Sequence, residues 1–198
     1  HWIISRLNTM IHEVDVAYED YEPTKAVRAI QGFVIDDLSN WYVRLNRKRF
    51  WVGDLNPEKE AAYKTLHTCL VTVAKLASPI APFYMEKLYL DLMNDPFKGE
   101  SIHLQNFPDS NTGLIDEELE DKMNLAQTIC SLVHSLRKQH KVKVRQPLSK
   151  ILIPVLDKER REHIQAVEGL IKSEVNIKNI EYVDNTSGVV VKNAKPNF

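Results

Sequence analysis

Positive charge and aromatic rings gather in one short stretch, residues 39–51, which reads SNWYVRLNRKRFW. Its cations are Arg44, Arg47, Lys48 and Arg49, and Trp51 follows them closely. The whole chain carries a formal charge of only −1, so these cations form a local excess. A segregated basic patch of this kind is typical of a surface that binds anions.

A second basic run covers residues 137–145, RKQHKVKVR, with five bases and no acid. It includes Lys141, Lys143 and Arg145. Acids gather separately in residues 116–121, DEELED, with five in six positions. A second explanation stays open, because acids stabilise helix N-termini and bases stabilise C-termini, so both runs could be solvated helix ends.

The elements that position the first basic stretch are two helices. Apolar residues spaced three and four apart predict a helix from about residue 2 to 18 and a longer one from an N-cap at Thr24 to Arg49. The apolar stripe of the longer helix stops near Leu45, so its last turn should project beyond the core. Trp41 lies on the stripe and is expected in the core, whereas Trp51 is the better candidate for stacking. Tyr42, beside the stripe, fits either role.

Three further helices are expected, over residues 58–77, from Pro82 onward, and over residues 116–137. The periodicity then changes. Because Lys141, Lys143 and Arg145 alternate with valines, an extended chain would place the three cations on one side. The last fifty residues predict strands at 149–155, 174–183 and 188–192 and a helix at 157–173.

These patterns predict a mainly α protein in two parts. Residues 1–140 are expected to form a helical bundle with at least four long helices. Residues 141–198 are expected to form a small β-α-β-β unit. Both the helical pattern and its loss after residue 137 support this division.

The sequence offers little for catalysis or metal binding. The phosphate-cradling motifs G-x-x-x-x-G-K-[ST] and G-x-G-x-x-G are absent, as are the G-x-S-x-G elbow and the H-E-x-x-H pair. Cys69 and Cys130 form no C-x-x-C pair. No catalytic or metal-binding residue is therefore predicted, and a binding module is the expected class. An independent enzyme of another type is the less favoured alternative.

Composition bounds the setting of the protein. No apolar run reaches the roughly 18 residues of a membrane span, and the N-terminus has no signal-peptide pattern. The cysteine usage suits a reducing compartment, so a cytoplasmic location is expected. The chain begins with His1 and not with Met, which suggests a piece of a longer protein.

Five segments resemble, in the same order, the region that follows the catalytic domain of class I aminoacyl-tRNA synthetases. They are WIISRLN, YEPTKAVRAIQGFVIDDLSNWYVRLNRKRFW, LASPIAPFYMEKLY, SIHLQNFPD and KVKVRQPLSKILIPV. Pro79, Pro82 and Glu86 resemble a segment shared by the isoleucine, valine and leucine enzymes. The form NWYVRLNRKRFW, and the later SEVNIKNIEYV and KPNF, are closer to the isoleucine enzyme in its eukaryote-like branch.

This resemblance implies an anticodon-binding domain that packs against the anticodon stem and loop of tRNA(Ile). The implied tRNA-binding residues are Arg44, Arg47, Lys48, Arg49, Trp51, Lys141, Lys143 and Arg145. Cations would contact phosphates, and guanidinium and aromatic planes would stack on unpaired bases. The other implied partner is the rest of the synthetase chain, in a monomeric enzyme.

The resemblance also limits what this chain does alone. It lacks the H-I-G-H and K-M-S-K-S segments that bind ATP in this family, the editing domain, and any cysteine cluster for zinc. No cofactor is therefore expected in this chain, whereas ATP, and zinc as a further candidate, belong to the whole enzyme. The family continues beyond KPNF, so the β-α-β-β unit is expected to be truncated. Two alternatives stay open: the same module of a valyl- or leucyl-type synthetase, and a structural docking module without RNA contact.

Overall fold

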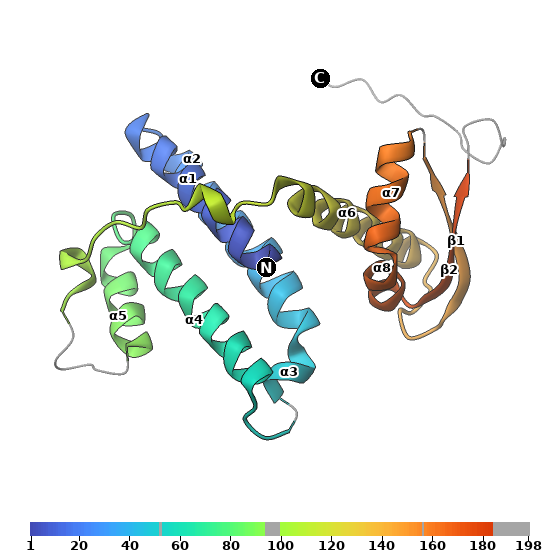
Figure 1. Ribbon diagram of the computed structural model, residues 1–198, viewed down its shortest axis with the longest axis horizontal. Helices are drawn as coiled ribbons and strands as arrows, with labels where there is room; N and C mark the ends of the chain where they lie inside the picture. Colours follow the sequence, from blue (N-terminus) through green and yellow to red (C-terminus); the bar gives the residue numbers. More distant parts are fainter. Residues whose placement is uncertain (52, 94–99, 156, 184–198) are drawn as a thin grey trace. The chain divides into compact units, whose positions relative to one another are not determined.

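The computed structural model describes residues 1–51, 53–93, 100–155 and 157–183. Its contacts divide the chain into two compact units, His1–Asp116 and Glu117–Phe198. Figure 1 shows the elements of both units. The strand predicted at residues 188–192 lies outside the described residues.

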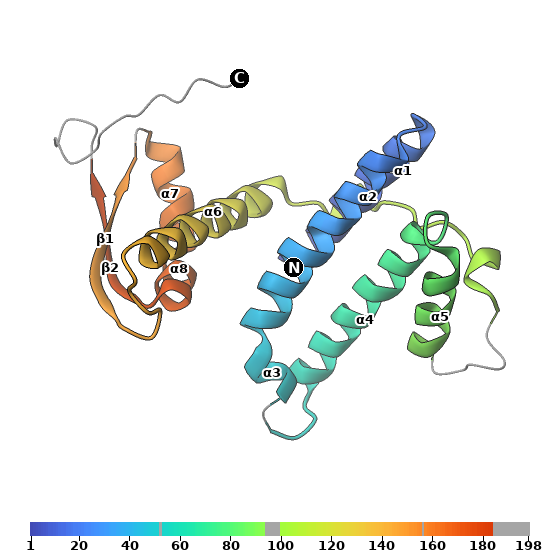
Figure 2. The ribbon, with the colours of Figure 1, turned by 180° about the vertical axis from the view of Figure 1, so that it is seen from behind.

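The first unit is helical. Its elements are α1 (Trp2–Glu19), α2 (Pro23–Gly32), the π-helix η1 (Phe33–Val43), α3 (Arg47–Trp51), α4 (Pro57–Ala77), α5 (Pro82–Leu92) and the short 3₁₀ helices η2 (Ile102–Leu104) and η3 (Thr112–Leu114). Both ribbon views show α2 and η1 running as one long rod beside α1, with α4 returning from the far end of the rod (Figures 1 and 2). Because the turns between these helices are short, neighbours in sequence pack on each other.

The long predicted helix is real, but its middle is not α-helical. It begins with Glu22 as N-cap and Pro23 at the first helical position, and not at Thr24. Residues Phe33–Val43 are π-helical, which is a rare conformation that widens the turn. The buried side therefore includes Phe33, Asp37 and Tyr42 as well as the predicted Leu38 and Trp41.

A partly buried ion pair joins this rod to α1. The Nε atom of Arg6 donates to Oδ2 of Asp37 at 3.1 Å, and the Asp37 side chain is only 9% exposed. Around it, α1, α2, η1 and α4 share one apolar core that includes Met10, Val14 and Leu76, all fully buried. A carboxylate buried here needs a cationic partner, so Arg6 fixes how α1 and η1 pair.

The segment after α5 is held to the bundle by side chains. Glu86 of α5 accepts hydrogen bonds from the Ile102 amide at 2.8 Å and from Ser101 Oγ at 3.1 Å. Asn8 of α1 then accepts from the Asn111 amide through Oδ1 at 2.9 Å. Glu86, singled out in the sequence beside the two prolines, thus anchors the chain where it leaves the helices.

The second unit begins with α6 (Glu117–Gln139) and continues through β1 (Leu148–Pro154), α7 (Lys158–Ala166), α8 (Glu168–Val175) and β2 (Ile177–Val183). The two strands pair in parallel, with Leu148 opposite Ile177 and Pro154 opposite Val183. Two helices, α7 and α8, make the crossover that a parallel pair requires. The predicted β-α-β part of the unit is present, with the helix broken in two at Val167.

The contacts place α6 with the second unit, since it packs on α7 and α8. This division falls one helix before the boundary expected at residue 140, where the sequence periodicity changes. The reason is that a change of periodicity marks the end of α6, whereas packing depends on the buried face of α6. That face carries Met123, Ala126, Cys130 and Val133.

The fold class is confirmed: the protein is mainly α, with a small α+β unit. Within the described residues, strands occur only after residue 147. In that same part of the chain, no helix is long and apolar enough to span a membrane.

Candidate nucleic-acid interface

The first candidate surface is the end of the long rod, where α3 turns into α4 (Figure 1). Asn46 interrupts the helix just before α3, and Phe50 then turns inward and is 5% exposed. Its ring packs edge-on against Tyr63 of α4 at 5.2 Å and Tyr42 of η1 at 6.1 Å between centroids. These three rings lock α3 onto the bundle.

Hydrogen bonds from the same rings reinforce this contact. Tyr63 Oη donates to the carbonyl oxygen of Phe50 at 3.0 Å, and Tyr42 Oη donates to that of Ala62 at 3.1 Å. Burial raises the pKa of the Tyr42 phenol above its usual value, so this donor stays protonated. The turn that carries the cations is thus attached to two helices.

All four predicted cations of this region are exposed: Arg47, Lys48 and Arg49 lie on α3, and Arg44 lies at the end of η1 just before it. Arg49 is held in place, since its Nη2 donates to the Glu58 carbonyl oxygen at 2.7 Å and its Nη1 to Asn46 Oδ1 at 3.0 Å. Within the described part of the chain, Arg47 and Lys48 have no hydrogen-bond or ion-pair partner. Their charges are therefore available to an external anion.

The aromatic residues of this stretch separate into two groups. Trp41 is 6% exposed, as expected for a core residue, and Tyr42, which fitted either role, is buried at 9%. Trp51 is 68% exposed, and the Arg47 guanidinium carbon lies 6.0 Å from its ring centroid. A guanidinium beside an open indole forms the type of platform on which an unpaired base stacks.

Lys59 belongs to the same surface although the sequence gave no reason to select it. Asn56 caps α4 by accepting the Lys59 amide at 2.8 Å, and Lys59 Nζ donates to the Gly53 carbonyl oxygen at 3.0 Å. Only the fold brings this first turn of α4 next to α3. Acids are also present, and one of them, Glu60, is paired with Lys64 at 2.7 Å.

The second candidate surface, around Lys141, Lys143 and Arg145, is a turn and not the extended chain that the alternation predicted. Lys141 has a left-handed backbone, with φ of 55°, and the Gln146 amide donates to the Lys143 carbonyl oxygen at 3.0 Å. The prediction was wrong because the end of α6 dictates this geometry. All three cations are nevertheless exposed.

Backbone bonds define how α6 ends. The Val142 amide donates to the Arg137 carbonyl oxygen at 2.8 Å and the Lys141 amide to that of Lys138 at 3.2 Å, which together make a Schellman motif. Glycine usually fills the left-handed position, and a side chain there costs roughly 1–2 kcal/mol. Lys141 occupies it here, so a cation stands where the backbone alone would favour glycine.

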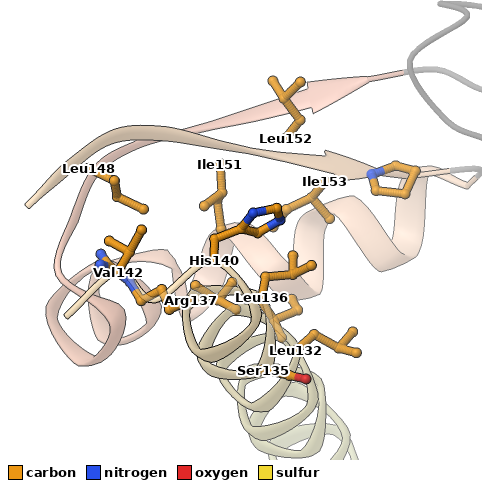
Figure 3. A pocket seen from close by; sticks show the side chains of 13 residues that line it. Leu132, Ser135, Leu136, Arg137, His140, Val142, Leu148, Ile151, Leu152 and Ile153 are labelled. Carbon is orange, nitrogen blue, oxygen red and sulfur yellow. The ribbon is translucent and has the colours of Figure 1, made fainter. Parts of the chain in front are cut away.

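Beside this turn, α6 and β1 line an open apolar pocket of about 650 Å³. Figure 3 shows Leu132 and Leu136 of α6 facing Ile151 and Ile153 of β1, with the His140 ring among them. Polar lining is sparse, and the Nη1 and Nη2 atoms of Arg137 donate to backbone carbonyls. The pocket therefore lacks the converging polar groups of a reactive site.

The two basic surfaces belong to different units, so each is described by itself: four predicted residues lie on α3, with Arg44 just before it, and three lie on the turn after α6. Within the part of the chain that the structure describes, no cluster of His, Cys, Asp and Glu has the geometry to hold a metal ion. In each unit, exposed cations on a fixed turn make a surface suited to contacting phosphates, and in the first unit an open indole lies beside them.

Comparison with known proteins fits this picture. Residues 1–152 match the family model described as the anticodon-binding domain of tRNA ligase. The chain therefore belongs to the family of tRNA-ligase anticodon-binding domains. It is 62% identical, over its whole length, to an isoleucine–tRNA ligase of Cytophaga hutchinsonii and 54% identical to one of Bacteroides fragilis.

More distant relatives have the same name. A Dehalococcoides mccartyi isoleucine–tRNA ligase is 40% identical over 89% of the chain. These matches confirm the resemblance to a class I synthetase anticodon-binding region of the isoleucine type, whereas the eukaryote-like branch stays a prediction. The chain spans 17–18% of the length of these three relatives.

Proposed function

We propose that this chain binds the anticodon stem and loop of tRNA(Ile), with α3 as the principal contact surface. Arg44, Arg47, Lys48 and Arg49 contact phosphates, and Trp51 stacks on an unpaired base of the loop. Lys141, Lys143 and Arg145 contact a second set of phosphates. RNA recognition of single-stranded loops uses this combination of cations and stacking planes.

One observation carries the proposal: a domain of the anticodon-binding family exposes Arg47 and Lys48, which have no ion pair among the described residues, beside a 68% exposed Trp51. An exposed indole beside a guanidinium offers a flat surface on which an unpaired base can stack. The packing of Phe50 beneath them holds these groups in fixed positions, which lowers the entropy cost of binding.

The test is the affinity of the chain for a tRNA(Ile) transcript, measured by fluorescence anisotropy over a salt series. Each phosphate contact should contribute about −0.7 to −0.9 to the slope of log affinity against log salt. A transcript of tRNA(Ile) with a scrambled anticodon loop is the matched control and should bind more weakly. Equal, salt-independent affinity for both would instead favour the docking-module alternative.

In the whole ligase, this chain acts as one domain of a monomeric, cytoplasmic enzyme that uses ATP to join isoleucine to tRNA. Its relatives carry that ligase name, and zinc is a further candidate cofactor elsewhere in the whole enzyme. Because no phosphate-cradling motif occurs here, the chain alone should show no isoleucine-dependent exchange of pyrophosphate into ATP. Exchange above a protein-free control would contradict this assignment of roles.

A further inference from the structure

We propose that Arg137, together with Asn176, is a positioning residue that fixes the basic turn Lys141–Arg145 for phosphate binding. This inference rests on the proposed function, and it adds a buried residue that never touches the tRNA. Arg137 lies on the apolar face of α6 and is 3% exposed. A guanidinium at such a position needs polar partners, because burying an unpaired charge is costly.

Backbone carbonyls supply partners for both Nη atoms of Arg137, whereas the buried Nε has no hydrogen-bond partner among the described residues. Its Nη1 donates to the carbonyl oxygens of Lys143 and Gln146, both at 3.0 Å. Its Nη2 donates to those of Val175 at 2.8 Å and Asn176 at 3.1 Å. One side chain therefore ties the turn after α6 to the end of α8. Figure 3 shows Arg137 reaching from α6 toward the side of Val142 and Leu148.

Among the described residues, Arg137 donates to carbonyl oxygens and not to carboxylates, so its partners add no negative charge to the surface. Arg137 forms no ion pair with an acidic side chain in the described part of the chain. Partial negative charge at the end of α8 stabilises it, as helix C-termini do for cations. The turn is thus fixed without an acid that would offset its positive charge.

Asn176 holds the same turn from the other side. Its Nδ2 donates to the Val144 carbonyl oxygen at 2.9 Å. The carbonyls of Lys143 and Val144 in the turn, and of Gln146 just after it, therefore accept hydrogen bonds from the side chains of Arg137 and Asn176. The exposed side chains of Lys141, Lys143 and Arg145 consequently stand on a fixed backbone, which is the condition for simultaneous phosphate contacts at low entropy cost.

The alternative is that Arg137 only stabilises the second unit. The salt slope of tRNA binding separates the two roles, because a purely structural residue changes the free energy of unfolding but not the number of phosphates that a folded domain contacts. Arg137→Lys keeps the charge but loses the planar fork that reaches four carbonyls. Asn176→Gly removes the bond to Val144 at a left-handed position, with φ of 51°, that glycine tolerates well.

Each variant is tested as the full chain, with the tRNA(Ile) transcript, at a temperature where circular dichroism shows it folded. For Arg137→Lys, the slope should become shallower by about 0.7–0.9, one phosphate contact, and affinity should fall several-fold at low salt. Asn176→Gly should act in the same direction. If Arg137→Lys does not fold, Asn176→Gly decides: an unchanged slope overturns the proposal.

A third variant separates this inference from the proposed function. Replacing Lys141, Lys143 and Arg145 together by Gln should lower the slope by up to about 2.1–2.7. If this triple variant lowers the slope while folded Arg137→Lys does not, the positioning role is wrong and RNA binding by the turn stands. If the triple variant leaves the slope unchanged, the turn does not contact phosphate and the positioning role falls with it. Binding through α3 is then judged separately by its own variants.

Discussion

The two basic surfaces of this protein are held rigid in different ways. On the α3 turn, aromatic packing holds the backbone in place. Phe50 packs against Tyr42 and Tyr63, and the α3 cations, Arg47, Lys48 and Arg49, project from the same short helix. On the turn after α6, Arg137 and Asn176 hold backbone carbonyls. The comparison teaches that the backbone beneath a cationic surface can be held rigid either by a buried apolar ring or by a buried cation. In the second case the buried cation must bond to carbonyls and not to an acid, so that the surface keeps its positive charge.

The largest expected effect breaks the aromatic support. Phe50→Ala should destabilise the first unit by about 3–5 kcal/mol, because it removes a buried ring together with its contacts. Denaturant unfolding, monitored by amide hydrogen exchange, should show a loss of protection in α3 and at the start of α4. The protection of the turn after α6 should stay unchanged. Phe83→Ala is the matched control, since Phe83 is 92% exposed. Equal losses for both variants would refute the anchoring role of Phe50.

Reversing two charges tests the surface itself. The double variant Arg47→Glu and Arg49→Glu should weaken tRNA binding and make the salt slope shallower by about 1.4–1.8, two phosphate contacts. The fold should survive, because both side chains are exposed and such positions usually change stability by less than about 0.5 kcal/mol. Arg49 also loses its bond to the Glu58 carbonyl oxygen, so stability is measured alongside affinity.

The control for these reversals lies in the acidic start of α6. Glu117→Gln with Glu118→Gln should leave tRNA affinity unchanged or slightly stronger, since acids repel phosphate. Comparable weakening by this control would show that the effect is not localised on α3.

Lys48 stands in line with the apolar stripe of the rod, yet it is exposed, so Lys48→Gln should make the salt slope of tRNA binding shallower by about 0.7–0.9.

Trp51→Ala tests stacking without a change of charge. Its loss should cost about 1–3 kcal/mol of binding free energy, as for a base on an aromatic platform, and should leave the salt slope nearly unchanged. Trp51→Phe should restore part of the affinity. A shallower salt slope with little loss of affinity would mean that the indole positions Arg47 and does not stack on a base.

The smallest effect is expected at the left-handed residues that follow two of the helices. Lys141 and Tyr21 both take left-handed backbone conformations, with φ of 55° and 57°, after α6 and α1. Replacing either by Gly should stabilise the protein by up to about 1 kcal/mol by relieving this strain, measured by denaturant unfolding. Only Lys141→Gly should also weaken tRNA binding. Equal affinity of the two variants would remove Lys141 from the interface.

Much of this fold could be predicted because apolar spacing is a local signal. The 3.6-residue period fixed α1, α4 and α6 to within a residue or two, and Pro82 marked the start of α5. The π-helical stretch Phe33–Val43 could not be predicted, because no local pattern distinguishes it from an α-helix. The extended form predicted for residues 141–145 failed, since alternation of Lys and Val does not outweigh the Schellman end of α6.

The candidate site divides in the same way. By itself, the sequence determined which side chains are cationic and aromatic, that the stripe ends before Arg47, and that Trp41 belongs to the core. Tertiary structure alone decided that Tyr42 is buried, that Lys59 joins the α3 surface, and that Arg137 is a buried clamp and not one more surface base. The physical reason is that charge and periodicity are properties of the local sequence, whereas burial and carbonyl partners depend on how the folded chain packs, both within a turn, as for Lys59 and Gly53, and between distant segments, as for Arg137 and Val175.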